Sequence, residues 1–231
     1  MSEAKKYKLS VLGDSISSYG GVTDNPEINK TLVKNLSYYS SPMDKSDLTD
    51  VADTYWMQTA NALGLEICVP NGCGASRVTD TVRESYPDAV IPRGMERADS
   101  LHRDDGTYPD IIFIYLGIND IGNGISPELY EREYDALISK ITSDYKDAKI
   151  YVGTLTAQNR KATEELNEIY NGKIKSVAKK YSARVVDFAR DSQITFENYR
   201  DYTVDGLHPN KEGMKRLAQC LISALKSDLS L

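Results

Sequence analysis

Short apolar runs alternate along the chain with longer segments whose apolar residues recur at helical spacing, and this alternation restricts the possible folds. Five runs rich in apolar or β-branched residues predict strands: Lys8–Leu12, Leu65–Val69, Ile111–Leu116, Lys149–Val152 and Arg184–Phe188. Between them, helical periodicity predicts three helices: Tyr55–Leu63, Leu129–Tyr145 and Leu166–Tyr181. A last helix is expected after Pro209, running to about Leu225, with four apolar side chains on one face: Met214, Leu217, Leu221 and Leu225.

A chain organised in this way is expected to form a parallel sheet with helices on both faces. Parallel neighbours need a crossover of about a dozen residues or more, and the crossover is usually a helix. The pattern predicts the α/β class, as a three-layer α/β/α sandwich with a five-stranded parallel sheet, in one domain over residues 1–231. Ligands bind beyond the carboxyl ends of such strands, so the residues that follow each strand are candidates for a functional site.

Two long stretches without periodicity, Tyr19–Asp53 and Thr79–Pro109, interrupt this pattern. Loops of that length in a compact domain are usually functional or poorly ordered. Aromatic residues cluster near the first stretch: Tyr38, Tyr39, Tyr55 and Trp56. They either offer flat surfaces to sugar rings or pack the loops onto the core, and the second role is the commoner one.

Composition and charge exclude several classes of partner. The formal net charge is −6 and no dense basic run occurs, so nucleic acid is not expected to bind. The longest apolar stretch, Ile111–Ile118, is far shorter than the roughly 20 residues of a membrane helix, and the N-terminus does not resemble a signal peptide. Three cysteines without a C-x-x-C pair (Cys68, Cys73 and Cys220) favour reduced thiols. We expect a cytoplasmic protein without a membrane partner, as a monomer or small homo-oligomer.

The first candidate motif, Gly13-Asp14-Ser15, follows the first predicted strand. Gly13 allows a sharp turn off the strand, and the Asp14 carboxylate can accept hydrogen bonds from turn amides. Ser15 is then presented at the carboxyl edge of the sheet. These residue types also form ordinary turns, so the tripeptide by itself is a weak indication of chemistry.

A second motif, Gly117-Ile118-Asn119-Asp120, follows the third predicted strand. The Asn119 amide can donate a hydrogen bond to a developing oxyanion, and Asp120 can fix the turn behind it. The alternative interpretation is an Asx turn without chemical function.

A third motif, Asp205-Gly206-Leu207-His208, precedes the last predicted helix. An aspartate three residues before a histidine can accept the Nδ1 proton, which leaves Nε2 free to take a proton from a serine. The alternative is a helix N-cap beside an isolated histidine. The chain has only two histidines, and the other, His102, lies in a polar stretch that predicts a solvated loop. All three motifs fall where one serine site requires them, which favours a common function.

These motifs resemble those of the SGNH, or GDSL-like, hydrolases, whose blocks are an N-terminal G-D-S, a central glycine, G-x-N-D and a C-terminal D-x-x-H. The resemblance covers nearly the whole chain and implies a flavodoxin-like sandwich. It implies Ser15 as nucleophile, His208 as general base, Asp205 as the residue that orients the imidazole, and Asn119 as an oxyanion-hole side chain. Ile16 stands where these hydrolases usually have leucine, which changes nothing in the chemistry.

The central block of the family corresponds here to Asn71–Arg77, within the sequence NGCGASR. In the family, a glycine of this block lends its backbone N–H to the oxyanion hole, together with the N–H of the nucleophile, here Ser15. Gly74 lies nearest the expected place, whereas alignment of Ser76 and its successors puts Ala75 there. A backbone N–H is present in either register, and Gly74 is our prediction. Arg77 meets an anionic substrate group or is a surface arginine, the commoner case.

The resemblance implies hydrolysis of a small-molecule carboxylic ester through an acyl-serine, without a metal or an organic cofactor. Short-acyl esters such as acetylated carbohydrates are the expected substrates. An acyltransferase on the same scaffold and a non-catalytic module that binds an acylated or glycosidic ligand, such as a carbohydrate, are the alternatives. A flavodoxin-like flavin carrier does not explain the D-x-x-H motif, and nothing in the sequence marks Cys73 as an activated nucleophile.

Overall fold

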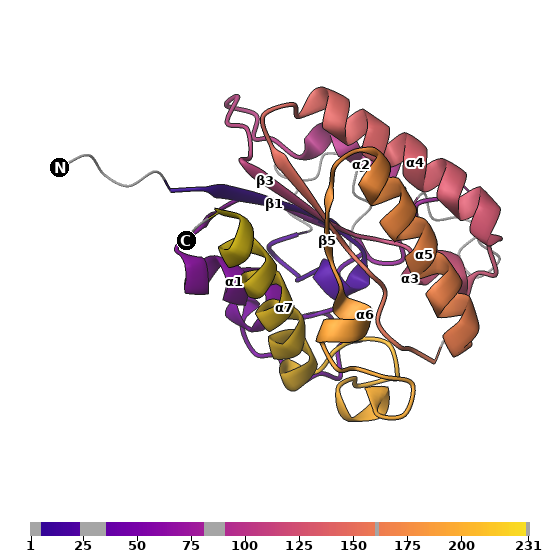
Figure 1. Ribbon diagram of the computed structural model, residues 1–231. Coiled ribbons are helices and arrows are strands. Elements are labelled where there is room, and N and C mark those ends of the chain that lie inside the picture. The colour runs from indigo at the N-terminus through magenta and orange to yellow at the C-terminus, as the bar shows by residue number, and fades with distance from the viewer. Residues whose placement is uncertain (1–5, 24–35, 81–90, 160–161, 230–231) are drawn as a thin grey trace.

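Five parallel strands form the central sheet of this computed structural model, which describes residues 6–23, 36–80, 91–159 and 162–229 (Figure 1). The strands are β1 (Lys8–Gly13), β2 (Glu66–Gly72), β3 (Ile111–Tyr115), β4 (Lys149–Gly153) and β5 (Arg184–Val186). Their order in the sheet is β2-β1-β3-β4-β5, and all neighbouring pairs are parallel. The predicted α/β class and five-stranded parallel sheet are therefore confirmed.

Helices cover both faces of the sheet and complete the three predicted layers (Figure 1). On one face α1 (Tyr55–Leu63) packs against α7 (Lys211–Leu229), and on the other α4 (Pro127–Asp144) packs against α5 (Glu164–Lys180). The described residues also form three short helices: α2 (Gly94–Arg97), α3 (Ile118–Gly122) and α6 (Phe188–Asp191). Single 3₁₀ turns span Ser15–Ser17, Val51–Asp53, Ala98–Ser100 and Tyr199–Asp201.

The core lies between the sheet and the two helix layers, as continuous apolar strands require. Every residue of β3 is buried, because a central parallel strand is covered on both faces. In α7 the predicted apolar face is confirmed, since its four members are fully buried: Met214, Leu217, Leu221 and Leu225. Burial of each such leucine side chain stabilises the folded state by roughly 1.5–3 kcal/mol.

Capping side chains explain why two helices begin before their predicted first residues. The Ser126 Oγ accepts a hydrogen bond from the Leu129 N–H, and Pro127 occupies the first turn of α4, which needs no amide donor. In the same way the Thr163 Oγ1 accepts the Leu166 N–H at the start of α5. The predicted starts at Leu129 and Leu166 rest on apolar periodicity alone. The first turn of each helix is polar, so it lies before the first residue of that apolar pattern.

The structure corrects the sequence prediction at three strand ends. The fifth strand ends at Val186 and Phe188 begins α6, where the Thr154 side chain donates to Asp187 and accepts the Ala189 N–H. The second strand continues beyond Val69 to Gly72, because its last residues pair with the end of β1. The segment after β3, predicted as a turn, forms the helix α3.

Gly13 and Gly72 pair with each other at the carboxyl ends of β1 and β2. Gly13 is the last residue of β1, and the Ser15–Ser17 turn predicted to leave the strand follows it, although Gly13 itself has no positive φ. A Cβ at Gly13 would lie 2.1 Å from Ser17 Oγ, and one at Gly72 would lie 2.5 Å from the Ser17 carbonyl oxygen. Glycine is needed at both positions because the Ser15–Ser17 turn packs directly against the sheet edge.

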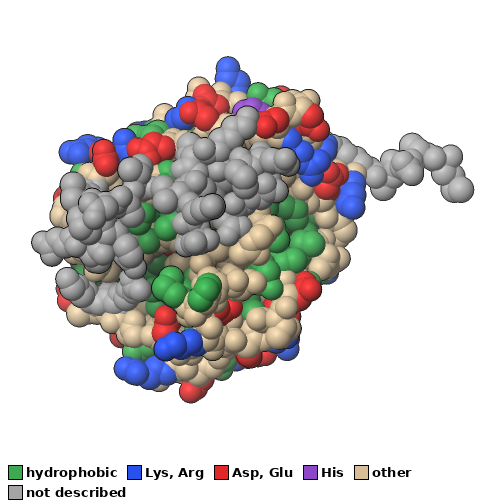
Figure 2. Space-filling view, turned by 180° about the vertical axis from the view of Figure 1, so that it is seen from behind, with side chains coloured by type: hydrophobic (Ala, Val, Ile, Leu, Met, Phe, Trp, Pro, Cys, Tyr) green, Lys and Arg blue, Asp and Glu red, His purple; other side chains and the backbone are tan. Residues whose placement is uncertain are grey.

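On the face shown in Figure 2, acidic and basic side chains are interspersed over the part of the surface that is described. No helix within the described ranges has both the length and the apolar composition needed to cross a membrane. All three cysteines are buried, and none of them forms a disulfide bond.

We expect Gly72→Ala to lower the free energy of unfolding by about 1–3 kcal/mol, because its Cβ would overlap backbone atoms that cannot move freely. The matched control is Gly172→Ala on the exposed surface of α5, where nothing lies within 4 Å of the added Cβ. That change should raise the free energy of unfolding by about 0.5–1 kcal/mol. Urea unfolding of both variants checks the opposite signs, and destabilisation by both would contradict this account of Gly72.

Candidate active site

The candidate site lies at the carboxyl edge of the sheet, between β1 and β3. The chain leaves β1 towards β2 on one side, whereas β3 pairs with β1 on the other, so the crossover direction changes here. A crevice forms at such a switch point in open α/β sheets. Ser15 follows β1 and Asn119 follows β3, so both reach this crevice.

Ser15 opens a 3₁₀ turn that is bonded from within and from α1. The Asp14 Oδ1 accepts the Ile16 N–H at 2.9 Å, as predicted for a turn-forming aspartate. From α1, the Tyr55 hydroxyl lies 2.7 Å from Ser17 Oγ and Trp56 Nε1 donates to the Ser17 carbonyl at 3.1 Å. The turn that carries Ser15 is therefore held by the core as well as by its own sequence.

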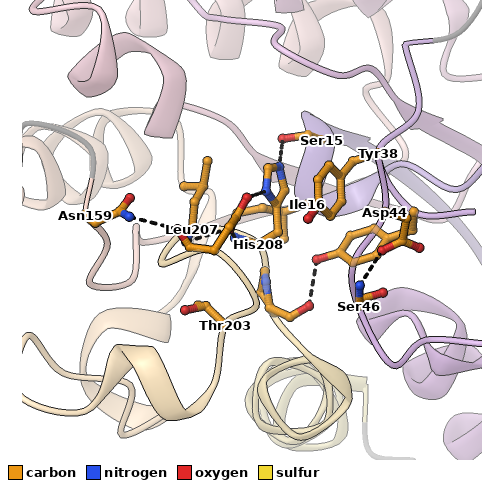
Figure 3. A network of polar contacts seen from close by, with 12 residues as sticks. Ser15, Ile16, Tyr38, Asp44, Ser46, Asn159, Thr203, Leu207 and His208 are labelled. Atoms are coloured by element: carbon orange, nitrogen blue, oxygen red, sulfur yellow. Dashed lines mark hydrogen bonds and ion pairs between the residues drawn. The ribbon is translucent and has the colours of Figure 1, made fainter. Parts of the chain in front are cut away.

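The structure brings Ser15, His208 and Asp205 into one line of hydrogen bonds (Figure 3). His208 Nε2 lies 2.9 Å from Ser15 Oγ, and His208 Nδ1 lies 2.8 Å from Asp205 Oδ2. The other carboxylate oxygen of Asp205 accepts the backbone N–H groups of Leu207 and His208. Asp205 does not cap the last helix, because Asn210 Oδ1 accepts the Gly213 N–H at the start of α7.

The Asp205 carboxylate is held in its ionised form. Partial burial would by itself raise its pKa, but hydrogen bonds from the His208 ring and from the His208 and Leu207 N–H groups outweigh burial. Together they hold the pKa of Asp205 well below its usual range. An ionised Asp205 fixes the proton of His208 on Nδ1 and leaves Nε2 as the acceptor that faces Ser15.

Ser15, Ala75 and Asn119 line one cavity, and the candidate donors to an oxyanion are the Ser15 N–H, the Ala75 N–H and the Asn119 Nδ2. The Gly74 N–H, our predicted donor, is engaged, since it donates to the Leu36 carbonyl at 2.6 Å. A Cβ at Gly74 would lie 2.1 Å from that same oxygen, which accounts for glycine there. Ala75 has a φ of +65°, and no acceptor for its N–H is found among the described residues.

Asn119 and Asp120 connect α3 to the segment that contains Ala75. Asn119 Nδ2 donates to the Ser76 carbonyl at 3.0 Å and lies 3.4 Å from Asp14 Oδ2. The Asp120 carboxylate accepts the N–H groups of Val78 and Thr79 and the Thr79 hydroxyl. Asp120 thus fixes a segment distant in sequence rather than the turn predicted for it.

Arg97 is the residue of this region that sequence reasoning missed. Its fully buried guanidinium donates from Nη2 to the Gly13 carbonyl at 2.8 Å and to Ser76 Oγ at 2.9 Å. From Nη1 it donates to the backbone and side-chain oxygens of Asn71 at 2.7 and 2.9 Å. Arg97 lies in the aperiodic stretch after Thr79, where neither spacing nor a motif distinguishes it from a surface arginine.

A cavity of about 630 Å³ opens over Ser15 and contains the predicted residues. Its walls are Ser15, Leu36, Ser37, Tyr38, Pro42, Met43, Lys45, Gly74, Ala75, Ile91, Asn119, Asp205 and His208. Part of this lining comes from the two long stretches that lack periodicity, so these stretches do reach the site. Residues 24–35 and 81–90 of the same stretches lie outside the described residues.

Other residues considered from sequence lie outside this cavity. Arg77 is buried and does not line the cavity, so the surface position expected as its commoner role is wrong. Cys73 is fully buried beside the Gly74 carbonyl. His102 is partly buried, with Nδ1 3.1 Å from the Tyr145 hydroxyl, rather than solvated. Within the described ranges no cluster of three His, Cys, Asp or Glu side chains has the arrangement of a metal site.

Most of the aromatic residues near the first long stretch pack into the core. Tyr39, Tyr55 and Trp56 are buried, as the commoner interpretation predicted. Tyr38 is the exception, because it lines the cavity and its ring faces His208.

Comparison with known proteins gives a family match and several similar folds. The model of the GDSL-like Lipase/Acylhydrolase family matches residues 11–216. A structure described as a GDSL-like lipase from Bacteroides uniformis is 23% identical, covers 98% of this chain and 97% of its own, and has a TM-score of 0.71. One from Bacteroides ovatus is 22% identical, covers 97% and 100%, and has a TM-score of 0.72.

A carbohydrate esterase also has a similar fold. The family two carbohydrate esterase from Clostridium thermocellum, solved with cellohexaose, is 18% identical and has a TM-score of 0.66. The match covers 100% of this chain and 67% of that one. A search of the curated proteins found no match. At these identities, the likeness to solved structures establishes the fold alone.

We expect Arg97→Met to lower the free energy of unfolding by at least about 2 kcal/mol, since each buried acceptor left without a donor costs roughly 1–3 kcal/mol. The matched control is Arg190→Met, because the Arg190 side chain is 77% exposed and forms its ion pair with the neighbouring Asp191. Its effect should stay within about 0.5 kcal/mol. Chemical denaturation of the two variants checks the difference, and equal losses would contradict the role given to Arg97.

We expect the stabilisation by Asp205 to depend on pH in one direction. Because the pKa of Asp205 is lower in the folded than in the unfolded chain, its contribution is present above the unfolded value of about 4 and is lost as the pH falls below it. Asp205→Asn should therefore be less stable than the native protein at pH 7, with a difference that shrinks towards pH 3. Urea midpoints at several pH values measure this, and a difference independent of pH would refute it.

Proposed function

This chain belongs to the GDSL-like lipase/acylhydrolase family, and we propose that it hydrolyses short-acyl carboxylic esters through an acyl-serine intermediate at Ser15. Family membership makes it an ester-hydrolysing enzyme. The line of hydrogen bonds from Ser15 Oγ through the His208 ring to Asp205 is the single observation that carries the proposed mechanism. A serine, a histidine and a carboxylate in this geometry form an activated nucleophile with its base.

In the first step, Ser15 Oγ forms a bond to the ester carbonyl carbon while its proton moves to His208 Nε2. The carbonyl π pair moves onto oxygen, and Asp205 stabilises the imidazolium that results. The oxyanion then returns its electron pair, the bond from carbon to the alkoxy oxygen breaks, and the leaving alcohol takes the proton from His208 Nε2. The product of this half-reaction is the acyl-serine at Ser15.

We assign the oxyanion hole to the Ser15 N–H, the Ala75 N–H and the Asn119 Nδ2, whose longer contact, at 3.4 Å to Asp14 Oδ2, is the one exchanged for the oxyanion. Ala75 replaces Gly74 in this proposal because the Gly74 N–H already donates to the Leu36 carbonyl. The loss of one oxyanion donor in a comparable hydrolase costs about 10²–10³ in kcat.

Hydrolysis of the acyl-serine repeats these steps with water. His208 Nε2 takes a proton from the attacking water, whose oxygen forms a bond to the acyl carbon. The second tetrahedral intermediate breaks the bond to Ser15 Oγ, which recovers its proton from His208. The carboxylic acid leaves and the starting enzyme is restored, so the cycle consumes only the ester and water.

Acetylated carbohydrates are the substrates that we propose within this class. The fold resembles that of a carbohydrate esterase solved with cellohexaose, and the cavity falls within the roughly 300–1,000 Å³ of small-molecule sites. The cavity walls combine apolar side chains, including Ile91 and Met43, with the polar groups around Ser15. Such a lining suits a small acyl group next to a partly polar alcohol.

We expect the native protein to hydrolyse p-nitrophenyl acetate faster than the butyrate and octanoate esters. Ser15→Ala and His208→Ala should each lower kcat by several orders of magnitude, because each removes a partner of the first step. The release of p-nitrophenol measures all three esters in one assay.

Matched controls come from the same residue types outside the cavity. Ser223→Ala on the exposed surface of α7 and His102→Ala beside Tyr145 should leave kcat within about twofold. Equal activity in the native protein and in Ser15→Ala on every ester would overturn the proposed mechanism in favour of a binding module. Product analysis in the presence of a sugar alcohol distinguishes transfer of the acyl group from its hydrolysis.

A further inference from the structure

The Tyr38 ring stacks flat on the imidazole of His208 (Figure 3). The two ring centroids are 3.5 Å apart and the ring planes differ by 6°. Tyr39 approaches the same imidazole edge-on, with its centroid 6.3 Å away and its plane at 88°. The side chain assigned as general base is thus contacted on a face as well as at its two nitrogens.

Hydrogen bonds connect the Tyr38 segment to both halves of the reacting pair. The Tyr38 N–H donates to Ser18 Oγ at 2.8 Å, and Ser18 Oγ donates to the Ser15 carbonyl, also at 2.8 Å. The Tyr39 hydroxyl donates to the carbonyl of Pro209, the residue after His208, at 2.9 Å. These contacts fix the Tyr38 ring relative to both Ser15 and His208.

Both nitrogens of the imidazole are already engaged. Asp205 binds Nδ1 and Ser15 faces Nε2, so no ring nitrogen is left for a further hydrogen bond, and Tyr38 contacts the ring on a face. The face of a phenol ring carries the negative part of its quadrupole and attracts a cation placed over it. His208 becomes such a cation when it takes the Ser15 proton.

The Tyr38 hydroxyl is not a competing acid or base. Burial, followed by the nearby carboxylates of Asp205 and Asp44, raises the pKa of Tyr38 to about 12. At neutral pH the phenol therefore stays protonated, and its ring is what acts on His208.

We propose that Tyr38 is a positioning residue for the reaction, whose ring keeps the imidazole in line between Asp205 and Ser15 and stabilises the imidazolium formed in the first step. This inference rests on the proposed function. It gives a role to the first long stretch without periodicity, Tyr19–Asp53, because that stretch places an aromatic ring face on His208. The ring face that contacts His208 is also unavailable as a platform for a sugar.

A series of rings of nearly equal shape at position 38 tests the proposal. Tyr38→Phe should keep kcat for p-nitrophenyl acetate within about twofold of native, since the stacking face remains. Placing 4-fluoro-, 3,5-difluoro- and 3,4,5-trifluorophenylalanine at position 38 weakens the negative ring face step by step. We expect kcat to fall along the series, reaching about one tenth of the Phe value, with a smaller change in KM.

Tyr108 provides the matched control, because it stacks on His102 outside the cavity, with centroids 4.7 Å apart and planes at 7°. Trifluorophenylalanine at position 108 should leave kcat unchanged. A flat series at position 38, with turnover that still requires Ser15, would overturn the inference and leave the proposed function intact. Turnover that Ser15→Ala does not reduce would overturn both. Thermal melting of each variant shows that the fluorinated chains fold alike.

Discussion

The buried guanidinium of Arg97 connects the ends of two strands, and the arrangement of the site depends on this connection. The carbonyls of Gly13 and Asn71 meet at one edge of the sheet, where a buried acceptor without a donor would be costly. One planar cation with several donors serves both of them and the Ser76 hydroxyl at once. The Ser15 turn and the Ala75 segment are thereby set relative to each other before any substrate binds.

The other contacts that fix the site converge on the imidazole of His208. Asp205 binds its Nδ1, Ser15 lies at its Nε2, and Tyr38 covers one face. The supporting residues come from parts of the chain that are far apart, because Ser15 after β1, Tyr38 of the first long stretch and His208 before α7 all line the same cavity. Preorganised groups of this kind stabilise developing charge without having to reorient during the reaction.

Most of the fold and of the site could be predicted from apolar periodicity and three short motifs. The strand pattern gave the sheet, and the three motifs placed Ser15, Asn119 and His208 at its carboxyl edge. Prediction failed where contacts between distant residues decide the outcome. Pairing with β1 extends β2 to Gly72, and neither pairing register nor the hydrogen bonds of Thr154 that end β5 can be read from local composition. Arg97 could not be found from sequence, because nothing in the residue type distinguishes a buried arginine from a solvated one.

By itself, the sequence determined the α/β class, the parallel sheet, the apolar face of α7 and the chemical types gathered at the site. These follow from the spacing of apolar residues and from motifs next to strand ends, which are local properties of the chain. Only the tertiary structure decided that the Gly74 N–H is engaged by Leu36 while that of Ala75 has no described acceptor. It alone placed the Tyr38 ring on His208. Both depend on where an aperiodic loop meets a distant segment, and that is settled by packing and hydrogen bonding across the fold.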